Sequence, residues 1–323
     1  MKEKQFKKIA SAGIISGIVM LGGAMASAAS ITTPIKGNHT FNTDTDIVIS
    51  TNDHAVSVGS GETVTGPGGV KVTIDVTNND MNQYGIFTQS GGRVDIDKIG
   101  LNSYSIGGYA IDGGKIIFGA GAEVTSDVGA ALFVYGNDSK IEVCADANLT
   151  SSYYGSGGGT LSAGGGGLLV IGTDSNIIND FSSAPRNDDH YVIFADSDGR
   201  VEVGDGAAIK VTGSNGNNNH AVMAGNGIYK TAGTVIIGKN SAITTDGSSS
   251  FGVAATQAGS YAEVGQGTQI IMGGIDSVGF AAINQSAAPL DDGAVVVLVD
   301  DGRTAVYAYD GGQVTCGNGI PHN

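Results

Sequence analysis

The chain has 323 residues, among them 54 glycines and no tryptophan, and 16 Lys and Arg against 31 Asp and Glu give a net charge of −15. This acidic balance argues against nucleic acid and anionic membrane surfaces as partners, because both attract basic patches. Glycine far exceeds its usual share of about 7%, but 41% of residues are hydrophobic and alternate regularly, which argues against disorder.

Residues 1–28 have the pattern of a secretory signal peptide. Four lysines precede an uncharged apolar run from Ile9 to Met25, and Ala26-Ser27-Ala28 form an A-x-A cleavage site. The alternative is a membrane anchor, but this run is rich in Gly and Ala, whereas a spanning helix needs about 20 strongly apolar residues. We therefore expect cleavage between Ala28 and Ala29 and a mature protein that is secreted or held at the cell surface.

Two regions are expected after the signal peptide. The polar segment 29–46, which contains Pro34, is predicted to cap the N-terminal end of the fold. Residues 47–323 carry a repeat, and Val314 opens a further copy shortly before the chain stops. The sequence therefore predicts one long repeat domain over 47–323 whose last copy is incomplete.

Each copy of the repeat closes with a small-residue turn, a basic or polar residue and then an aliphatic residue that starts a strand. Residues 90–94 (SGGRV) and 112–116 (DGGKI) are clear examples. Longer matches relate 131–143 to 191–203 and 131–141 to 167–177. The residues predicted to share one position in successive copies are Val94, Ile116, Ile141, Ile177, Val201, Val235, Ala262, Val295 and Val314.

Every copy contains up to three short segments with period-2 alternation, separated by Gly, Asn and Asp corners. Residues 94–96, 122–125 and 109–111 are examples of the first, second and third segments. Three strands per copy predict an all-β, single-stranded, right-handed parallel β-helix of about 11 coils, each of roughly 20–35 residues. A β-sandwich is the competing all-β fold, but the fixed order of the three segments favours the solenoid.

Three insertions interrupt the repeat between its second and third segments, at 151–167, 182–190 and 213–220. Loops inserted at the same point of successive coils lie on one side of a solenoid, where binding loops commonly gather. An equally good interpretation is that corners tolerate insertions, and Asn-rich corners also form ladders of stacked amides. The candidate binding residues are Tyr153, Tyr154, Arg186, Asp188, Asp189, His190, Asn217, Asn218 and Asn219.

No catalytic constellation emerges, and no cofactor or metal ion is expected. The clusters 42–44 (NTD) and 188–190 (DDH) resemble the carboxylate-rich strands of polygalacturonases, but they lie several coils apart, whereas paired hydrolytic carboxylates lie within about 10 Å. Asp291-Asp292 and Asp300-Asp301 lack the spacing of known calcium loops. These carboxylates are better explained as solvated residues at the corners of the coils than as catalytic or calcium-binding groups.

The two cysteines are predicted to be free thiols. Two cysteines in an exported protein usually suggest one disulfide. Cys144 and Cys316, however, follow positions six copies apart, about 29 Å at roughly 4.8 Å per coil. A disulfide needs Cα atoms within about 7 Å of each other.

A signal peptide followed by GG-R/K-V/I coils and acidic Gly/Asn corners resembles the passenger region of autotransporters of the pertactin-like and AIDA-like adhesin type. The resemblance covers roughly Ile47 to Val314. It implies type V secretion, display on or release from a Gram-negative outer membrane, and virulence-associated adhesion or autoaggregation. The implied partners are a host cell, a matrix or glycan ligand, or a second copy. The translocator barrel that follows such passengers is not found in this chain.

Two further hypotheses stay open beside the non-enzymatic adhesin. One is a polysaccharide-acting enzyme with a pectin lyase-like fold, which glycan assays with and without Ca²⁺ would detect. The other is a structural spacer, for which deletion of the insertions would leave binding unchanged.

Overall fold

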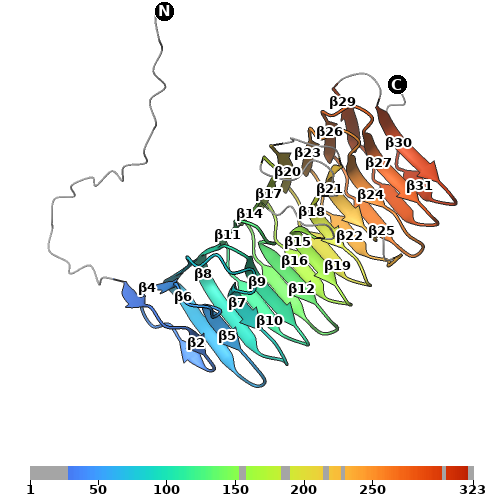
Figure 1. Cartoon of the computed structure of the whole chain (residues 1–323). Helices are drawn as coiled ribbons and strands as arrows, with labels where there is room; N and C mark the ends of the chain where they lie inside the picture. Colours follow the sequence, from blue (N-terminus) through green and yellow to red (C-terminus); the bar gives the residue numbers. More distant parts are fainter. Residues whose placement is uncertain are drawn as a thin grey trace, which may run out of the picture.

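The computed structural model describes residues 28–152, 158–182, 190–213, 218–226, 230–299 and 303–318. Within these ranges the chain forms strands that stack side by side into a rod, which runs from β2 near one end to β31 at the other (Figure 1). All pairings between the named strands are parallel, in one 20-stranded and one 11-stranded sheet. The predicted solenoid class is therefore confirmed.

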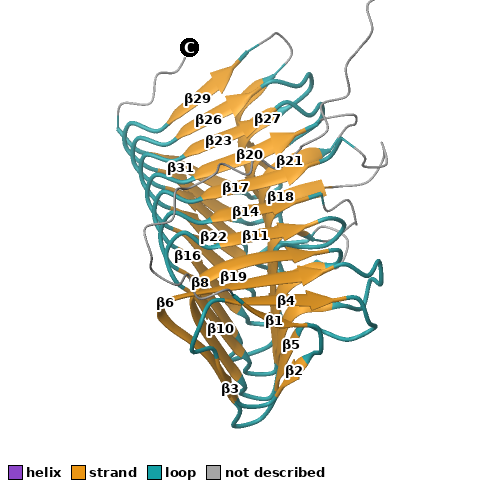
Figure 2. Cartoon of the chain, turned by 90° about the vertical axis from the view of Figure 1, so that its left-hand side faces the viewer, coloured by secondary structure: helices purple, strands orange, loops and turns teal. Residues whose placement is uncertain are grey.

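Three faces make up the rod, and the 20-stranded sheet supplies two of them (Figure 2). The first face consists of β3 (His39–Thr40), the start of β6 (Thr63–Val76), the start of β8 (Arg93–Ser103), β10 (Lys115–Phe118), β13 (Lys140–Val143), β16 (Leu168–Ile171), β19 (Arg200–Val203), β22 (Thr234–Ile237), β25 (Tyr261–Val264), β28 (Ala287–Leu290) and β31 (Gln313–Cys316).

The second face lies next to the first and continues the same sheet. It consists of β1 (Ala29–Ile31), β4 (Thr45–Ile49), the ends of β6 and β8, β11 (Glu123–Ser126), β14 (Asn148–Ser151), β17 (Asn176–Asp180), β20 (Ala208–Thr212), β23 (Ala242–Thr245), β26 (Gln269–Met272) and β29 (Val295–Leu298).

The 11-stranded sheet is the third face. It consists of β2 (Ile35–Lys36), β5 (Val56–Val58), β7 (Tyr84–Thr88), β9 (Ile106–Ile111), β12 (Leu132–Tyr135), β15 (Gly159–Gly164), β18 (His190–Ala195), β21 (Asn219–Ala224), β24 (Phe251–Ala255), β27 (Val278–Ile283) and β30 (Thr304–Tyr309).

The first and last coils are incomplete, so the number of full turns is slightly below the predicted eleven. At the N-terminal end, the segment 29–46 is itself wound into the rod, because β1 pairs with β4 and β3 pairs with β6. It therefore forms the first turn as well as the end of the fold. At the other end β31 pairs with β28 and is the last described strand.

The turn that closes each copy of the repeat, together with the aliphatic residue after it, is here called the closing phrase. It was predicted at the wrong corner in two coils. In the structure Leu169, not Ile177, shares the row of Ile141 and Val201, and Ala288, not Val295, lies between Ala262 and Val314. The match of 131–141 to 167–177 is wrong for the same reason. The match of 131–143 to 191–203 is confirmed over residues 140–143. On the third face it is off by one residue, because Leu132 shares a row with Ile193 through Leu161. Both misplaced residues follow the corner between the first and second faces.

Identical turn chemistry at two corners explains this error. Asp174 and Gly293 precede the misplaced residues and have φ of 56° and 69°, while Gly113 in the true closing phrase has φ of 81°. Asp, Asn and Gly all adopt this left-handed region at low cost. A short polar turn therefore marks a corner without indicating which face follows.

Aliphatic side chains fill one continuous core along the rod. Val94, Ile116 and Ile141 occupy the same row of the first face and are fully buried. Burial of a side chain of this size stabilises the fold by about 1.5–3 kcal/mol. The two cysteines lie outside this core: Cys144 follows β13 and Cys316 ends β31, six strands further along the first face, and both thiols are free and exposed.

The described part of the chain has no helix that is long and apolar enough to cross a membrane.

A candidate ligand-binding face

The outward side of the third face carries a concentration of rings. In β7, Gly85 and Ile86 are both buried, so the regular alternation is broken and Tyr84 and Phe87 both remain partly exposed. The next strand repeats this arrangement, since Ile106 pairs with Tyr84 and Tyr109 with Phe87. The third face therefore presents two outward positions for large side chains in each coil.

Six rings form a continuous chain over β5 to β12, here called the aromatic row. Neighbouring ring centroids lie 4.7 to 6.5 Å apart. Ring pairs at such separations add about 0.5–1.5 kcal/mol each beyond the area that they bury. The rings stay partly open to solvent, and Tyr135 at the end of the row is 47% exposed. The members are His54, Tyr84, Phe87, Tyr109, Phe133 and Tyr135.

Two phenols of the row, those of Tyr84 and Tyr109, stay neutral at physiological pH. Burial raises the pKa of Tyr109 to about 12, and the nearby Tyr84, Asp112 and Tyr135 add to this shift. Burial also raises the pKa of Tyr84. Neutral phenols both donate and accept hydrogen bonds, so the row combines an apolar surface with uncharged polar groups.

His54 fixes the N-terminal end of the row. Its Nδ1 accepts a hydrogen bond of 3.2 Å from the backbone N–H of Tyr84, and the two rings stack with centroids 4.7 Å apart and planes 6° apart. Burial lowers the pKa of His54 below 6.5, while Asp53 raises it and Lys36 lowers it. Lys36 and Asp53 also pair with each other at 3.1 Å. His54 is therefore held as the neutral imidazole.

We expect the coil that contains His54 to lose stability as the pH falls below 6.5. The unfolded imidazole takes up a proton near pH 6.5, whereas the folded one does so only at a lower pH, so the loss continues until the folded pKa is reached. Because the ring is partly exposed, the effect should stay below about 1 kcal/mol. Hydrogen exchange of the Tyr84 amide between pH 7.5 and 5 measures it. The variant His54→Gln keeps an acceptor but does not titrate, so the same acid-induced exchange in this variant would refute the assignment.

A pocket of about 230 Å³ lies further along the same face, between β18, β21 and β24. Tyr191, His220 and Phe251 follow one another in successive coils, with centroids 5.4 Å and 5.2 Å apart. The Nδ1 of His220 accepts the backbone N–H of Phe251 at 2.9 Å, which repeats the bond between His54 and Tyr84. The pocket is also lined by Met223.

The outward side of the first face differs from the third. Three of its described acidic residues are paired with a cation two residues earlier, as in Arg93–Asp95 at 2.7 Å and Lys140–Glu142 at 2.6 Å. Glu263 instead accepts a hydrogen bond of 2.6 Å from the Tyr261 hydroxyl. These charges are separated along the rod by aliphatic residues such as Ile117. Exposed pairs of this kind contribute little to stability, and they keep this face polar and locally neutral.

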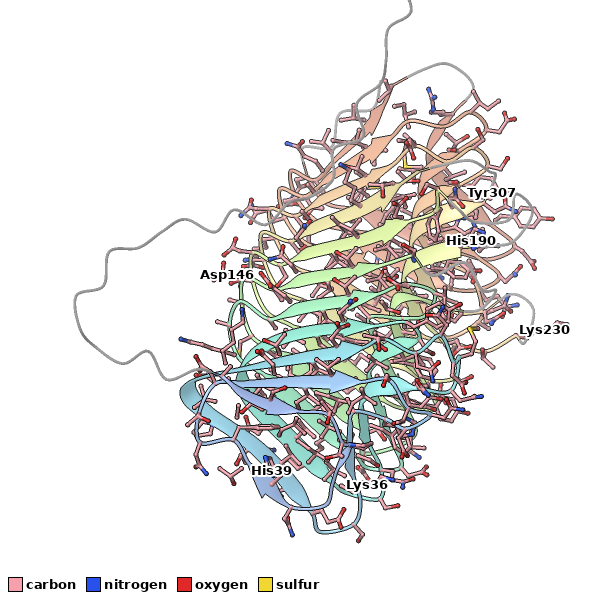
Figure 3. All side chains as sticks on the ribbon, turned by 60° about the vertical axis from the view of Figure 1, so that its left-hand side comes forward. Lys36, His39, Asp146, His190, Lys230 and Tyr307 are labelled. Carbon is pink, nitrogen blue, oxygen red and sulfur yellow. The ribbon has the colours of Figure 1, made fainter. Side chains whose placement is uncertain are left out.

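Most of the predicted binding residues lie outside the described residues: Tyr153, Tyr154, Arg186, Asp188, Asp189 and Asn217. The ends of all three insertions are described, and they confirm that the insertions enter between the second and third faces. Figure 3 shows His190 and Tyr307 on one side of the rod and Asp146 on the other. The insertions therefore begin at the edge of the face that carries the aromatic row.

All three insertions are shorter than predicted, because their ends belong to strands; at the third, Asn219 opens β21. Ser151 ends β14, and residues 159–164 form the buried strand β15. At the second insertion His190 opens β18. The small and polar residues 159–164 (GTLSAG) are expected to form a loop, but all six are buried in strand β15.

The structure corrects the loop assignment of His190 and Asn219, which are each 1% exposed and pair with each other across β18 and β21. His190 stacks on Phe181 at 5.0 Å, and the N–H of Asn219 donates to Ser250 Oγ at 3.0 Å. Both residues therefore have a structural role. Asn218 is partly exposed, has φ of 65° and lines the pocket.

Two described acids of the candidate clusters accept hydrogen bonds from the backbone. Asp44 Oδ1 accepts the N–H of Lys71 at 2.8 Å, and Asp292 Oδ1 accepts the N–H of Asn318 at 2.5 Å. Within the described ranges, no group of three or more His, Cys, Asp or Glu side chains is placed to hold a metal ion. Asn78 Nδ2 donates to Asn52 Oδ1 at 2.6 Å in the next coil, as expected of a corner ladder.

Comparison with protein-family models, with curated proteins and with solved structures finds no match to this chain.

Proposed function

We propose that this chain is the exported passenger of an autotransporter-type protein, secreted or displayed at the cell surface, and that it adheres to its target without catalysis. The signal-peptide pattern of residues 1–28 supports export, and the coil pattern supports the family. The observation that carries the adhesive function is the aromatic row. Adjacent exposed rings are a solubility liability for a protein that does not use them.

The aromatic row has the properties of a binding hot spot. Tyr is among the residue types that contribute most to binding energy, because it buries a large area with few rotatable bonds. Tyr109 and Phe133 occupy neighbouring coils with centroids 5.0 Å apart, on a backbone held by parallel ladders on both sides. Such a platform is ordered before binding, which lowers the entropic cost of association.

The three insertions at the edge of this face extend the proposed surface. Their described ends, Ser151 and Gly159, Ser182 and His190, and Gly213 and Asn218, all lie at the corner that leads into the third face. Loops that emerge beside a rigid platform are the usual way in which solenoids build a binding surface. The partners proposed are a host cell, its matrix or glycans, or a second copy of the chain.

The test compares two double variants of the full chain in adherence to cultured cells and to immobilised matrix. Tyr109→Ala/Phe133→Ala removes two rings of the row, and we expect a roughly tenfold or larger loss of affinity, which corresponds to about 1.4 kcal/mol. Val170→Ala/Ile236→Ala truncates two partly exposed residues of the first face and should leave adherence unchanged.

Equal adherence of the row variant and the wild-type protein would contradict the proposal. Sedimentation of the same proteins separates the two kinds of partner. If the wild-type chain self-associates and the row variant does not, the row acts between copies. If both are monomeric and only the variant loses adherence, the row contacts a foreign surface.

A further inference from the structure

We propose that the pocket between β18, β21 and β24 binds one neutral hexopyranose unit of a glycan. This inference rests on the adhesive function above and names the chemistry of its ligand. The pocket is built from three strands of the third face that lie in successive coils.

One wall of the pocket is a stack of rings. His220 is in register with Tyr191 on β18, and its ring lies 5.2 Å from that of Phe251 on β24. The bond from the Phe251 N–H to His220 Nδ1 fixes the imidazole plane and places the proton of the neutral ring on Nε2. Tyr191 and Met223 are 8% and 5% exposed, so they form a packed apolar base. The wall is therefore held in place without a ligand.

The apolar base and the ring edges together select a ligand with one apolar flat face and hydroxyl groups around it. Tyr191, His220 and Phe251 stack on one another, so their edges rather than their faces border the pocket. Ring edges carry partial positive charge and attract hydroxyl oxygens. A pyranose ring presents axial C–H groups on one face, which can lie on the Met223 side chain, while the hydroxyl groups around its edge meet the ring edges.

Hydroxyl groups line the rest of the pocket. Thr256 Oγ1 donates to the carbonyl of Gly225 at 3.0 Å, so its lone pairs can still accept a hydrogen bond from a ligand. Ser249 is exposed and lines the same pocket. Hydroxyls recognise sugar hydroxyls because each group both donates and accepts.

Charge and size restrict the ligand further. None of the described residues that line the pocket is Asp, Glu, Lys or Arg, and the whole chain carries a net charge of −15. Acidic sugars and nucleotides are therefore disfavoured. A volume of about 230 Å³ is below the roughly 300 Å³ at which pockets for drug-sized ligands begin. One sugar ring fits, and the rest of a glycan would extend out of the pocket.

Saturation-transfer NMR on the full chain tests this assignment, with D-glucose, D-galactose, D-mannose and the acidic sugar N-acetylneuraminate as probes. We expect transfer to at least one neutral hexose and none to N-acetylneuraminate. Phe251→Ala should weaken binding roughly tenfold. Thr256→Val keeps the shape of the side chain but removes its hydroxyl, and should weaken binding several-fold even if Phe251→Ala does not fold. Absence of transfer from all three hexoses, or equal transfer in the wild-type chain and Thr256→Val, would overturn the assignment.

The Tyr109→Ala/Phe133→Ala variant separates this inference from the proposed function. Its pocket is intact, so it should bind the hexose as the wild-type chain does while losing adherence. If the wild-type chain adheres through the row but binds no hexose, the pocket inference is refuted and the proposed function stands. If the chain binds hexose through Phe251 but adheres to no surface, the proposed function is refuted and the pocket inference stands.

Discussion

Phe118→Ala is expected to lower the free energy of unfolding by about 3–5 kcal/mol, the usual cost of truncating a buried phenylalanine. Phe118 is fully buried on the first face, in register with Ile96 and Val143. Its ring also reaches across the core toward Gly108 of the third face, where an added Cβ would lie 4.0 Å from Phe118 Cε2. Leu132 Cδ2 and Ile116 Cδ1 lie nearer to the same point, at 3.1 Å and 3.5 Å, so three side chains share the space that this glycine leaves.

The cost should be high within that range because the cavity cannot collapse easily. Gly108 has no side chain to move into the space, and the ladders on both faces hold the backbone. Urea unfolding of the two purified proteins measures the change. The control Phe118→Leu keeps most of the volume and should cost less than about 1.5 kcal/mol. Equal losses in both variants would contradict this packing.

Gly233→Ala is expected to cost about 3 kcal/mol through overpacking alone. A Cβ at Gly233 would lie 2.0 Å from the carbonyl oxygen of Ala195 and 2.4 Å from its carbon. Both atoms belong to the backbone of the preceding coil, so relief requires the two coils to separate. The φ of Gly233 is outside the left-handed region, and the penalty is therefore purely steric.

Gly100→Ala is the matched control for Gly233→Ala. Gly100 lies in β8, where the nearest atom to an added Cβ is Thr73 Cγ2 at 4.0 Å. This substitution should be neutral or should stabilise the protein by about 0.5 kcal/mol, because alanine has fewer unfolded conformations. Thermal unfolding of the pair is the measurement. A tolerated Gly233→Ala would mean that Gly233 does not lie against Ala195.

Alternation and corner residues were sufficient to predict the solenoid, because both features are local and recur in every coil. The register depends on which corner a turn belongs to, and this is where prediction failed at Ile177 and Val295. Each follows a turn whose chemistry is the same as that of the closing phrase. Only the pairing with neighbouring coils, which is a long-range property, distinguishes these corners.

The aromatic row was not predicted from the sequence, for a different reason. Period-2 alternation places Tyr84 on the same side as Ile86, but in β7 Gly85 and Ile86 are both buried while Tyr84 is partly exposed. A useful signal was present in the recurrence of Phe87, Tyr109 and Phe133 at one position of the third segment. The histidine bonds were harder to predict, since His54 and Tyr84 are 30 residues apart and His220 and Phe251 are 31 apart.

In the proposed function, the outward side of the third face is the adhesive surface. Site-specific photocrosslinking of the full chain to its target tests directly whether this face makes the contact. A photoreactive phenylalanine analogue replaces one residue at a time: Tyr109 or Phe133 on the third face, Val170 on the first face, and Thr125 on the second face. We predict crosslinks from positions 109 and 133 and none from 170 or 125. Crosslinks from position 170 or 125, with none from 109 and 133, would contradict the claim.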